Sequence, residues 1–406
     1  MTKKKPQIRF AGFDEEWERR KLGEVCISFD YGLNVASKEF DGINKYIRIT
    51  DIDDETRKFL MTDLTSPNCD IKLVDNYKLQ KGDIVFARTG ASVGKTYIYK
   101  ENDGIVYYAG FLIKAKVKND IYSKFIFYIT LTKQYEKFID ITSQRSGQPG
   151  VNAQEYAQFE FFIPLHKEQK KIGEYFENLD KLITLHQNKY DKLTNIKKSM
   201  LEKMFPKNGS NIPEIRFKGF SGDWKWHKLE EVVDIYDGVH QTPEYKDSGI
   251  MFLSVENITT LKSKKYISEE AFKKNYKVYP QKGDILMTRI GDVGTPNVVE
   301  TTEKLAFYVS LALLKPNKVE SYFLCNIIQS PLFQKGLKNR TLITAIPQKI
   351  NKYEIGKVEV ILSNSLQEQQ YIGKYFYNLD KIITLHRCKL EKLKNIKKAC
   401  MEKMFV

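Results

Sequence analysis

A glycine-bounded segment at residues 90–96, GASVGKT, has the residue types of a phosphate-binding loop. That motif needs four residues between its glycines, and it must open a helix whose amide groups face the phosphates. Here only Ala91, Ser92 and Val93 separate the glycines, and the TYIY that follows at 96–99 is typical of a strand. The spacing therefore predicts a tight turn at a sheet edge and argues against a nucleotide site.

A second pattern has the Glu-x-Lys spacing found in metal-dependent nucleases. It consists of Glu168 and Lys170, and the related positions 200 residues later are Glu368 and Gln370. Both glutamates stand where a helix is expected to begin, and the helix dipole favours a carboxylate there. We therefore predict a structural role. The sequence also lacks an Asn-Pro-Pro-aromatic motif, so we expect no methylation chemistry and no bound cofactor in this chain.

Histidine and cysteine are the remaining residue types with possible metal or redox chemistry. His186 and His386 have no other ligand nearby in sequence, so packing within a helix seam is favoured over metal binding. The five cysteines form no CxxC pair and indicate reduced thiols without a disulfide framework.

Composition points to a folded chain with a polyanionic partner. A hydrophobic content of 42% excludes a disordered chain. The formal charge of +15 over 406 residues favours a polyanionic partner. The opening MTKKKPQIRF lacks the apolar core of a secretory signal, and no stretch approaches the ~20 apolar residues of a membrane helix. We expect a cytoplasmic protein with no membrane partner.

The chain is an internal tandem repeat of about 200 residues. Segments 172–205 and 372–405 share roughly two thirds of their residues. Two further pairs follow in the same order: PQIRFAGFDEEWERRKLGEV with PEIRFKGFSGDWKWHKLEEV, and KGDIVFARTG with KGDILMTRIG. Two copies of one structural unit are therefore expected.

The most similar segments predict two long helices. Apolar residues alternate in steps of four and three from Ile172 to Leu193 and from Ile372 to Leu393, as in a coiled-coil seam. Each helix needs a cover for this stripe, and either the twin helix or the helix's own globule could provide it. Ser365 with Glu368 has the form of a capping box, whereas the first helix has Leu165 at the equivalent place.

The other segments read as mixed α/β globules. Lys-Gly-Asp turns precede the strands predicted at 84–86 and 285–287, and 46–49 and 252–255 form another matching pair of strands. We place the globules at 1–165 and 207–364 and the helices at 166–206 and 365–406. The two helices have stayed alike, which favours docking of the same type of partner on each. The two globules have diverged, which favours the reading of two different targets. Trp17, Trp224, Phe10 and Phe217 are expected in the cores.

If the polyanionic partner is DNA, its sequence would be read by donors and acceptors that distinguish base edges. Arg pairs with guanine and Gln or Asn with adenine, while lysines contact phosphates. Such residues occur in the Gly-bounded turns, in a polar turn after Asp237-Gly238, and in the polar loops before each long helix. The candidates are Arg88, Thr89, Ser92, Lys95, Arg145, Ser146, Gln148, Asn152, His240, Gln241, Thr242, Arg289, Arg340, Thr341, Gln348 and Lys349.

This layout resembles the specificity subunit of type I restriction-modification systems over essentially the whole chain. The matching pieces in the first copy are WERRKLGEV, YIRITDID, ARTGASVGK and FFIPLHKEQKKIGEYF. In the second copy they are WKWHKLEEV, DGVHQTPEY, TRIGDVG and LSNSLQEQQYIGKYF. Each piece is weak alone, but their order, repeated twice, is specific.

The resemblance implies two target-recognition domains that each read half of a split DNA site, held apart by antiparallel helices. It also implies two methylation subunits and further restriction subunits as partners, which would bring S-adenosylmethionine, ATP and Mg²⁺. We expect Lys197, Lys198, Lys397 and Lys398 to contact the methylation subunits from the face opposite the seam. The alternatives are a nucleotide hydrolase or nuclease in its own right, and a nucleic-acid-binding scaffold without sequence preference.

Overall fold

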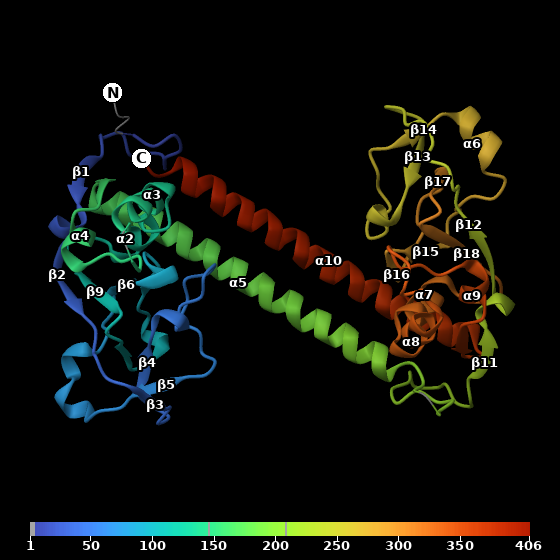
Figure 1. The fold of residues 1–406 in the computed structure, drawn as a ribbon, viewed down its shortest axis with the longest axis horizontal. Helices are drawn as coiled ribbons and strands as arrows, with labels where there is room; N and C mark the ends of the chain where they lie inside the picture. Colours follow the sequence, from blue (N-terminus) through green and yellow to red (C-terminus); the bar gives the residue numbers. More distant parts are fainter. Residues whose placement is uncertain (1–4, 145–146, 208) are drawn as a thin grey trace. The chain divides into compact units, whose positions relative to one another are not determined.

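In the computed structural model the chain forms two compact units, and residues 5–144, 147–207 and 209–406 are described (Figure 1). Unit 1 comprises Met1–His186 and Lys389–Val406, and unit 2 comprises Gln187–Cys388. Each unit contains one globule, the first part of the long helix that follows it and the last part of the other long helix. The packing units therefore differ from the four consecutive segments drawn from the sequence.

Each globule is built on a four-stranded antiparallel sheet with the same strand arrangement. In unit 1 the order is β2 (Cys26–Tyr31), β9 (Leu112–Val117), β6 (Ile84–Ala87) and β7 (Thr96–Ile98). In unit 2 it is β12 (Val233–Asp237), β18 (Leu311–Pro316), β15 (Ile285–Ile290) and β16 (Asp292–Val298). β6 and β15 follow the predicted turns, where Gly82 and Gly283 have φ of 89° and 95°.

Smaller elements surround these sheets. Unit 1 has β1 (Glu18–Lys21) with β10 (Glu160–Ile163), β3 (Ser37–Glu39) with β5 (Thr65–Pro67), and β4 (Lys45–Ile47) with β8 (Val106–Tyr108). Unit 2 has β11 (Lys225–Lys228) with β19 (Glu359–Leu362), and β14 (Tyr266–Ile267), β13 (Ile250–Leu253) and β17 (Leu305–Phe307). The strand predicted at 46–49 is one residue shorter, and the strand predicted at 252–255 has the same length but begins two residues earlier. The 3-10 helices η1 (Ile49–Asp51) and η7 (Val255–Asn257) occupy the ends of the predicted ranges.

Short helices complete the globules. They are α1 (Leu22–Val25), α2 (Ser123–Ile129), α3 (Lys133–Thr142) and α4 (Ala153–Ala157) in unit 1, and α6 (Glu269–Asn275), α7 (Ser321–Gln329), α8 (Pro331–Arg340) and α9 (Lys352–Gly356) in unit 2. The remaining 3-10 helices are η2 (Ile71–Leu73), η3 (Asp75–Tyr77), η4 (Gly90–Ser92), η5 (Glu101–Asp103) and η6 (Leu229–Glu231).

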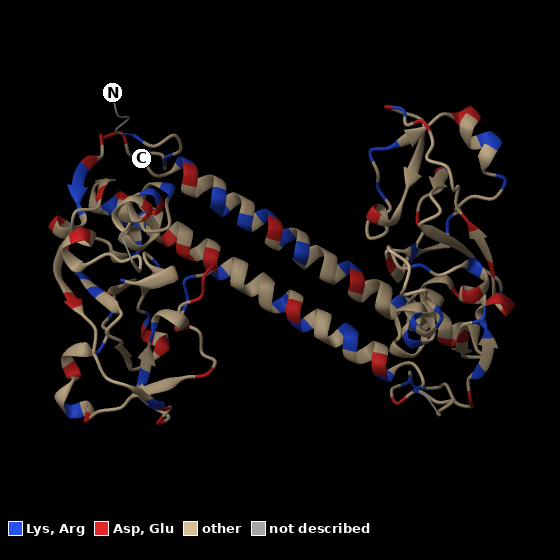
Figure 2. Cartoon of the chain, viewed as in Figure 1, with Lys and Arg blue, Asp and Glu red and all other residues tan. Residues whose placement is uncertain are grey.

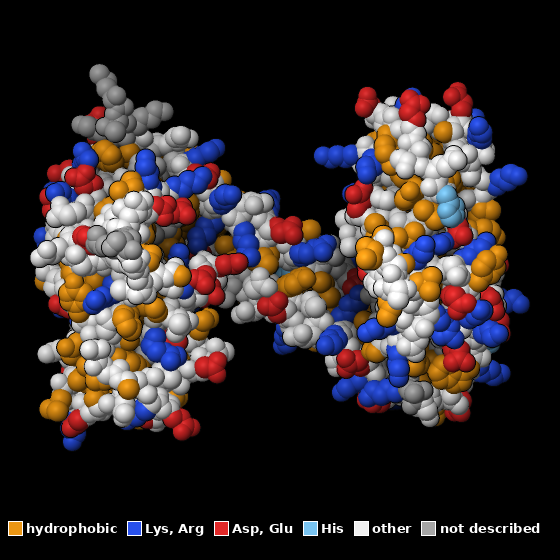
Figure 3. All heavy atoms as spheres, in the orientation of Figure 1, with side chains coloured by type: hydrophobic (Ala, Val, Ile, Leu, Met, Phe, Trp, Pro, Cys, Tyr) orange, Lys and Arg blue, Asp and Glu red, His pale blue; other side chains and the backbone are white. Residues whose placement is uncertain are grey.

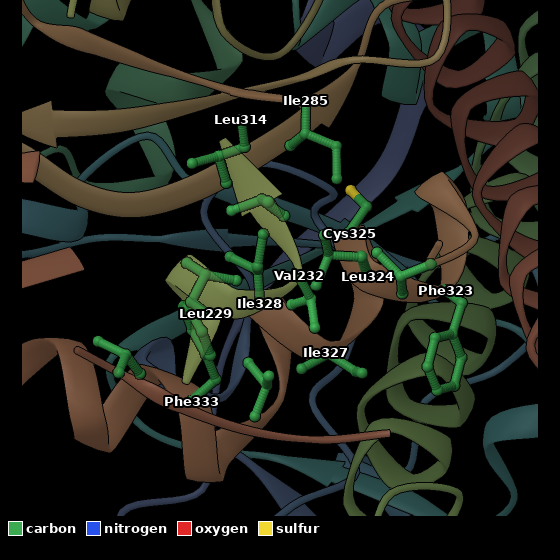
Figure 4. Packing of buried hydrophobic residues seen from close by; sticks show 14 of the residues in the cluster. Leu229, Val232, Ile285, Leu314, Phe323, Leu324, Cys325, Ile327, Ile328 and Phe333 are labelled. Atoms are coloured by element: carbon green, nitrogen blue, oxygen red, sulfur yellow. The ribbon is translucent and has the colours of Figure 1, made fainter. Parts of the chain in front are cut away.

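The core of each unit joins the globule to both long helices. In unit 2, side chains from α7 point toward those of the central sheet (Figure 4). Phe205, just after the first long helix, packs against Trp224, Phe323 and Phe376. The predicted core residues Trp17 and Trp224 are both 2% exposed, whereas Phe10 and Phe217 are partly buried against the same clusters.

The long helices are α5 (His166–Lys203) and α10 (Leu366–Lys403), each of 38 residues. The first part of the predicted seam is deeply buried, with Ile172 and Ile372 at 1% and Phe176 and Phe376 at 0% exposure. Further along, the seam residues are mostly half-buried. Both covers considered for the seam therefore occur: the globule covers its first part, and the other long helix contacts it within each unit.

Within each unit the two helices run antiparallel. In unit 1 Phe176 stacks on Phe405 while Asp180 pairs with Lys397, so the residue numbers rise on one helix as they fall on the other. In unit 2 Phe205 stacks on Phe376 and Lys197 pairs with Asp380. The duplicated sequence thus forms the same contact twice.

Glu168 of the Glu-x-Lys pattern and its counterpart Glu368 lie at the starts of the two long helices and have a structural role. Glu168 is 1% exposed and accepts two hydrogen bonds from Arg9, at 2.7 and 2.8 Å. Glu368 is 0% exposed and binds Arg216 in the same way, at 2.6 and 2.8 Å. Ser365 accepts a hydrogen bond from the Glu368 amide and α10 begins at Leu366, so the predicted helix start is confirmed. The return bond of a capping box is missing, because the Ser365 amide donates to the Ser363 hydroxyl at 3.1 Å and the Glu368 carboxylate binds Arg216.

Candidate DNA interface

In unit 1 the structure joins the turn after β6 to the loop before α4. The Gly90 amide donates to the Pro149 carbonyl at 2.9 Å, and the Val151 amide donates to the Arg88 carbonyl at 2.9 Å. Thr89 forms a β-bridge with Gly150. Two segments about 60 residues apart in sequence therefore share one edge.

Unit 2 contains the same junction between the turn after β15 and the loop before α9. The Gly291 amide donates to the Gln348 carbonyl at 2.8 Å, and the Gln348 side-chain amide donates back to the Gly291 carbonyl at 2.9 Å. The Ile350 amide donates to the Arg289 carbonyl at 3.0 Å. The backbone scaffold is therefore duplicated, whereas the side chains on it differ.

Several candidates have side chains at the surface of these junctions. Gln148, Gln348 and Lys349 are exposed, and Arg88, Thr89 and Ser92 are half-buried. The Arg88 guanidinium lies over the Tyr31 ring, 5.0 Å from its centroid, which fixes the direction of the side chain. Arg145 and Ser146 lie outside the described residues.

The turn after β12 adds His240, Gln241 and Thr242, which are all exposed. The strand end before it is close to the end of β15, because the Val309 amide donates to the Val239 carbonyl and the Arg289 amide to the Ser310 carbonyl, both at 2.9 Å. The structure therefore brings this turn to the sheet end that carries the second junction.

The prediction that Lys95 faces DNA is wrong, because its side chain is buried. Its side chain is 7% exposed, and its amine pairs with Asp54 at 2.5 Å and donates to the Ile52 carbonyl at 3.1 Å. The prediction against a phosphate-binding loop agrees with the structure, because strand β7 and no helix follows the turn. Gly94 has φ of 82°, and a Cβ there would lie 2.7 Å from Ile139, so the glycine allows α3 to pack closely.

Arg289 is also a correction. It is 8% exposed within β15 and forms an ion pair with Asp237 at the end of β12. Burial lowers the pKa of its guanidinium, and its Nε atom has no hydrogen-bond partner. Arg289 therefore holds two strands together and does not present its charge at the surface.

Asn152 is a helix cap and not a free reading residue. Its side chain accepts a hydrogen bond from the Glu155 amide at 2.9 Å, and Asn351 accepts one from Glu354 in the same way. The Asn-x-x-Glu spacing in both copies could have revealed this role in the sequence. Arg340 and Thr341 finish α8, where they donate to the carbonyls of Gly336 and Leu337 at 3.3 and 2.8 Å.

The prediction for the lysines on the long helices is wrong for two of the four. Lys197 pairs with Asp380 at 2.7 Å and Lys397 with Asp180 at 2.6 Å, and both side chains are about one-fifth exposed, at 18% and 21%. The alternation of four and three, continued beyond Leu193 and Leu393, reaches these lysines, so they belong to the seam. Lys198 and Lys398 are exposed, among the mixed charges along both helices (Figure 2).

Exposed apolar residues also lie beside the junctions, and they were not among the predicted candidates. In unit 1 they are Tyr31 and Phe111, whose side chains are 45% and 60% exposed. Phe111 lies beside the junction because the Arg88 amide donates a hydrogen bond to its carbonyl at 3.0 Å. In unit 2 they are Leu342, Ile343 and Ile346, in the loop after α8. The apolar run within an otherwise polar loop was the available signal.

No cluster of three or more His, Cys, Asp or Glu side chains suited to a metal ion occurs among the described residues, and His186 and His386 are half-buried in the helices. No helix in the described ranges combines the length and apolarity that crossing a membrane requires.

Comparisons with known proteins agree with this organisation. The family profile described as the type I restriction modification DNA specificity domain matches residues 14–195 and 221–395. The type I restriction enzyme MjaVIII specificity subunit of Methanocaldococcus jannaschii is 24% identical over 406 residues, covering 95% of this chain and 91% of that protein. The crystal structure of a type I restriction-modification system S subunit from M. genitalium has the same fold, with a TM-score of 0.64, 15% identity and 99% coverage of both chains. The chain therefore belongs to the DNA specificity family of type I restriction-modification systems.

Proposed function

We propose that this specificity protein reads a bipartite DNA site, with one globule for each half. The duplicated junction carries this proposal: the same backbone scaffold occurs in both units, but its exposed side chains differ. Gln148 stands on the first, and Gln348 with Lys349 on the second. Gln can pair with adenine in the major groove and Lys can contact phosphates, so equivalent edges would read different half-sites.

An exchange of globules tests the reading. Replacing residues 1–165 with the first globule of another family member should change one half-site and leave the other intact. Methylated positions are then mapped in cells that express the variant with its methylation subunits. The matched control replaces 207–364. If both half-sites changed together in either variant, the two-reader proposal would be refuted.

We further propose that the long helices bind two methylation subunits, while the chain itself is non-catalytic. Under this proposal those subunits hold S-adenosylmethionine, and the restriction subunits that join them supply the ATP- and Mg²⁺-dependent cleavage. Exposed leucines and isoleucines at equivalent places support two equivalent docking surfaces. Leu182 and Leu185 in unit 1 are 44% and 47% exposed, and Ile382 and Leu385 in unit 2 are 45% and 50% exposed. Hydrophobic side chains reach the surface among charged ones along these helices (Figure 3).

Native mass spectrometry of the assembled complex tests the docking. Replacing Leu182 and Leu185 with Asp should remove one copy of the methylation subunit, and replacing Ile382 and Leu385 should remove the other. Thr194→Asp, at an exposed residue of α5 outside the proposed surfaces, is a control for charge alone on the same helix. Two retained copies in both double variants would exclude these surfaces.

Helix length is the proposed spacer between the half-sites. A helix of 38 residues is ~57 Å long at 1.5 Å per residue. An insertion that tests the spacer should avoid the end of α5 near Met204. Met204 and Phe205 are each 3% exposed in the core of unit 2, so four residues added there would disturb that core. Seven residues added after His186 and after His386 keep the seam in phase and lengthen both helices by ~10 Å, or about three base pairs. Methylation mapping should show a longer gap between unchanged half-sites, and an unchanged gap in an active variant would refute the spacer.

A further inference from the structure

The loop between α8 and α9 carries three exposed apolar side chains. Leu342 is 52% exposed, Ile343 70% and Ile346 100%. Single apolar side chains scattered over a surface need no explanation, but three within five residues form a patch. Because Ile346 is fully exposed, it contributes no packing to the fold.

The base of this loop is held in place. The Leu342 amide donates to the Lys349 carbonyl at 2.8 Å, and the Lys349 amide donates back at 3.4 Å. Lys349 also bridges to Ile290 at the end of β15. The loop is therefore a short hairpin anchored to the central sheet, with its apolar tip in solvent.

The charge around the tip favours a polyanion. Between Pro331 and Tyr353 the chain has five basic residues and no Asp or Glu: Lys335, Lys338, Arg340, Lys349 and Lys352. In the first copy the corresponding segment includes Glu136 and Asp140. An apolar tip within a basic segment is the combination with which proteins push a side chain between stacked bases while they neutralise the phosphates beside it.

We infer that Ile346, supported by Ile343, is a wedge that the second globule inserts into a base step of its half-site. This inference rests on the proposed reading of DNA and adds a contact that hydrogen bonding to base edges does not require. An inserted side chain unstacks the step, and pyrimidine–purine steps unstack most easily. The loop would then contribute specificity at a position that no polar side chain contacts.

Fluorescence of 2-aminopurine in the bound duplex tests the wedge. The full-length chain, with its methylation subunits, first selects its site from a random duplex pool, and the globule exchange assigns the second half-site. 2-Aminopurine is then placed at each adenine position of that half-site, on either strand. At saturation, fluorescence should rise several-fold at one step with the wild type and with Ile346→Leu. Ile346→Ser should abolish the rise and weaken binding roughly tenfold, as expected for the loss of one buried apolar side chain.

Lys349→Ala is the matched control in the same loop. It should keep the fluorescence rise at saturation. The salt dependence of binding should weaken, with the magnitude of the slope of log K against log salt falling by about 1. The Tm of Ile346→Ser should equal that of the wild type, because the side chain is fully exposed. Unchanged fluorescence at every position of a selected site, or a rise that persists in Ile346→Ser, would overturn the wedge alone. Failure of the wild type to select any sequence would refute the proposed reading itself.

Discussion

Asp180 and Asp380 occupy equivalent places in the repeat, but unit 1 holds its carboxylate more firmly. Asp180 is 24% exposed and accepts hydrogen bonds from Lys397 at 2.6 Å and from Tyr128 at 2.8 Å. Burial and the nearby Asp180 carboxylate raise the pKa of Tyr128, so the phenol stays a donor. Asp380 is 44% exposed and binds Lys197, which also donates to Gln329 at 2.9 Å.

Asp180→Ala should therefore cost about 2 kcal/mol of local stability, because a charged and a phenolic donor both lose their acceptor. Asp380→Ala should cost about 0.5–1 kcal/mol, since that pair is more exposed and Lys197 keeps Gln329. Native-state hydrogen exchange resolved by mass spectrometry measures both. Amides of α10 in unit 1 should exchange roughly 30-fold faster in Asp180→Ala, and amides of α5 in unit 2 only about threefold faster in Asp380→Ala.

A double-mutant cycle with Lys397→Met separates the ion pair from its surroundings. If Asp180 acts through Lys397, the double variant should lose less stability than the sum of the two single losses. Additive losses, or equal effects of Asp180→Ala and Asp380→Ala, would refute the reasoning from burial and partner number.

Three other predictions concern side chains that the structure places in helix caps, an ion pair and a core. Asn152→Ala and Asn351→Ala should each cost about 1 kcal/mol of stability without changing the selected DNA sequence, as thermal unfolding and site selection would show. Lys95→Met should leave the salt dependence of DNA binding unchanged, because its amine faces Asp54; a reduced slope would return Lys95 to the phosphate contacts. Phe205→Ala should destabilise unit 2 by about 3–5 kcal/mol and leave hydrogen exchange in the globule of unit 1 unchanged.

The repeat and the long helices could be predicted because their determinants are local. A four-three alternation and the Lys-Gly-Asp turns fix helix and strand positions from short windows of sequence. The roles of Lys95 and Arg289 could not be predicted, since Asp54 and Asp237 lie 41 and 52 residues away along the chain. Most of β15 is buried, so no alternation of apolar and polar residues marked Arg289 as an inward-facing side chain.

The positions of Lys197 and Lys397 were predicted wrongly for a different reason. Lys197 and Lys397 lie one step beyond the last apolar position of the pattern, and a charged residue was taken as the end of the seam. Their aspartate partners come from the other copy of the repeat, so the seam continues through ion pairs where apolar contact stops.

Each unit takes the end of a long helix from the other copy, and this has a consequence for how such a chain could arise. The Ile8 amide donates to the Lys403 carbonyl at 2.9 Å, and the Ile215 amide donates to the Lys203 carbonyl at the same distance. The second contact joins residues 12 positions apart, whereas the first joins distant parts of the chain. A single ancestral copy could not complete its own core and would have required a second molecule to exchange helix ends with it.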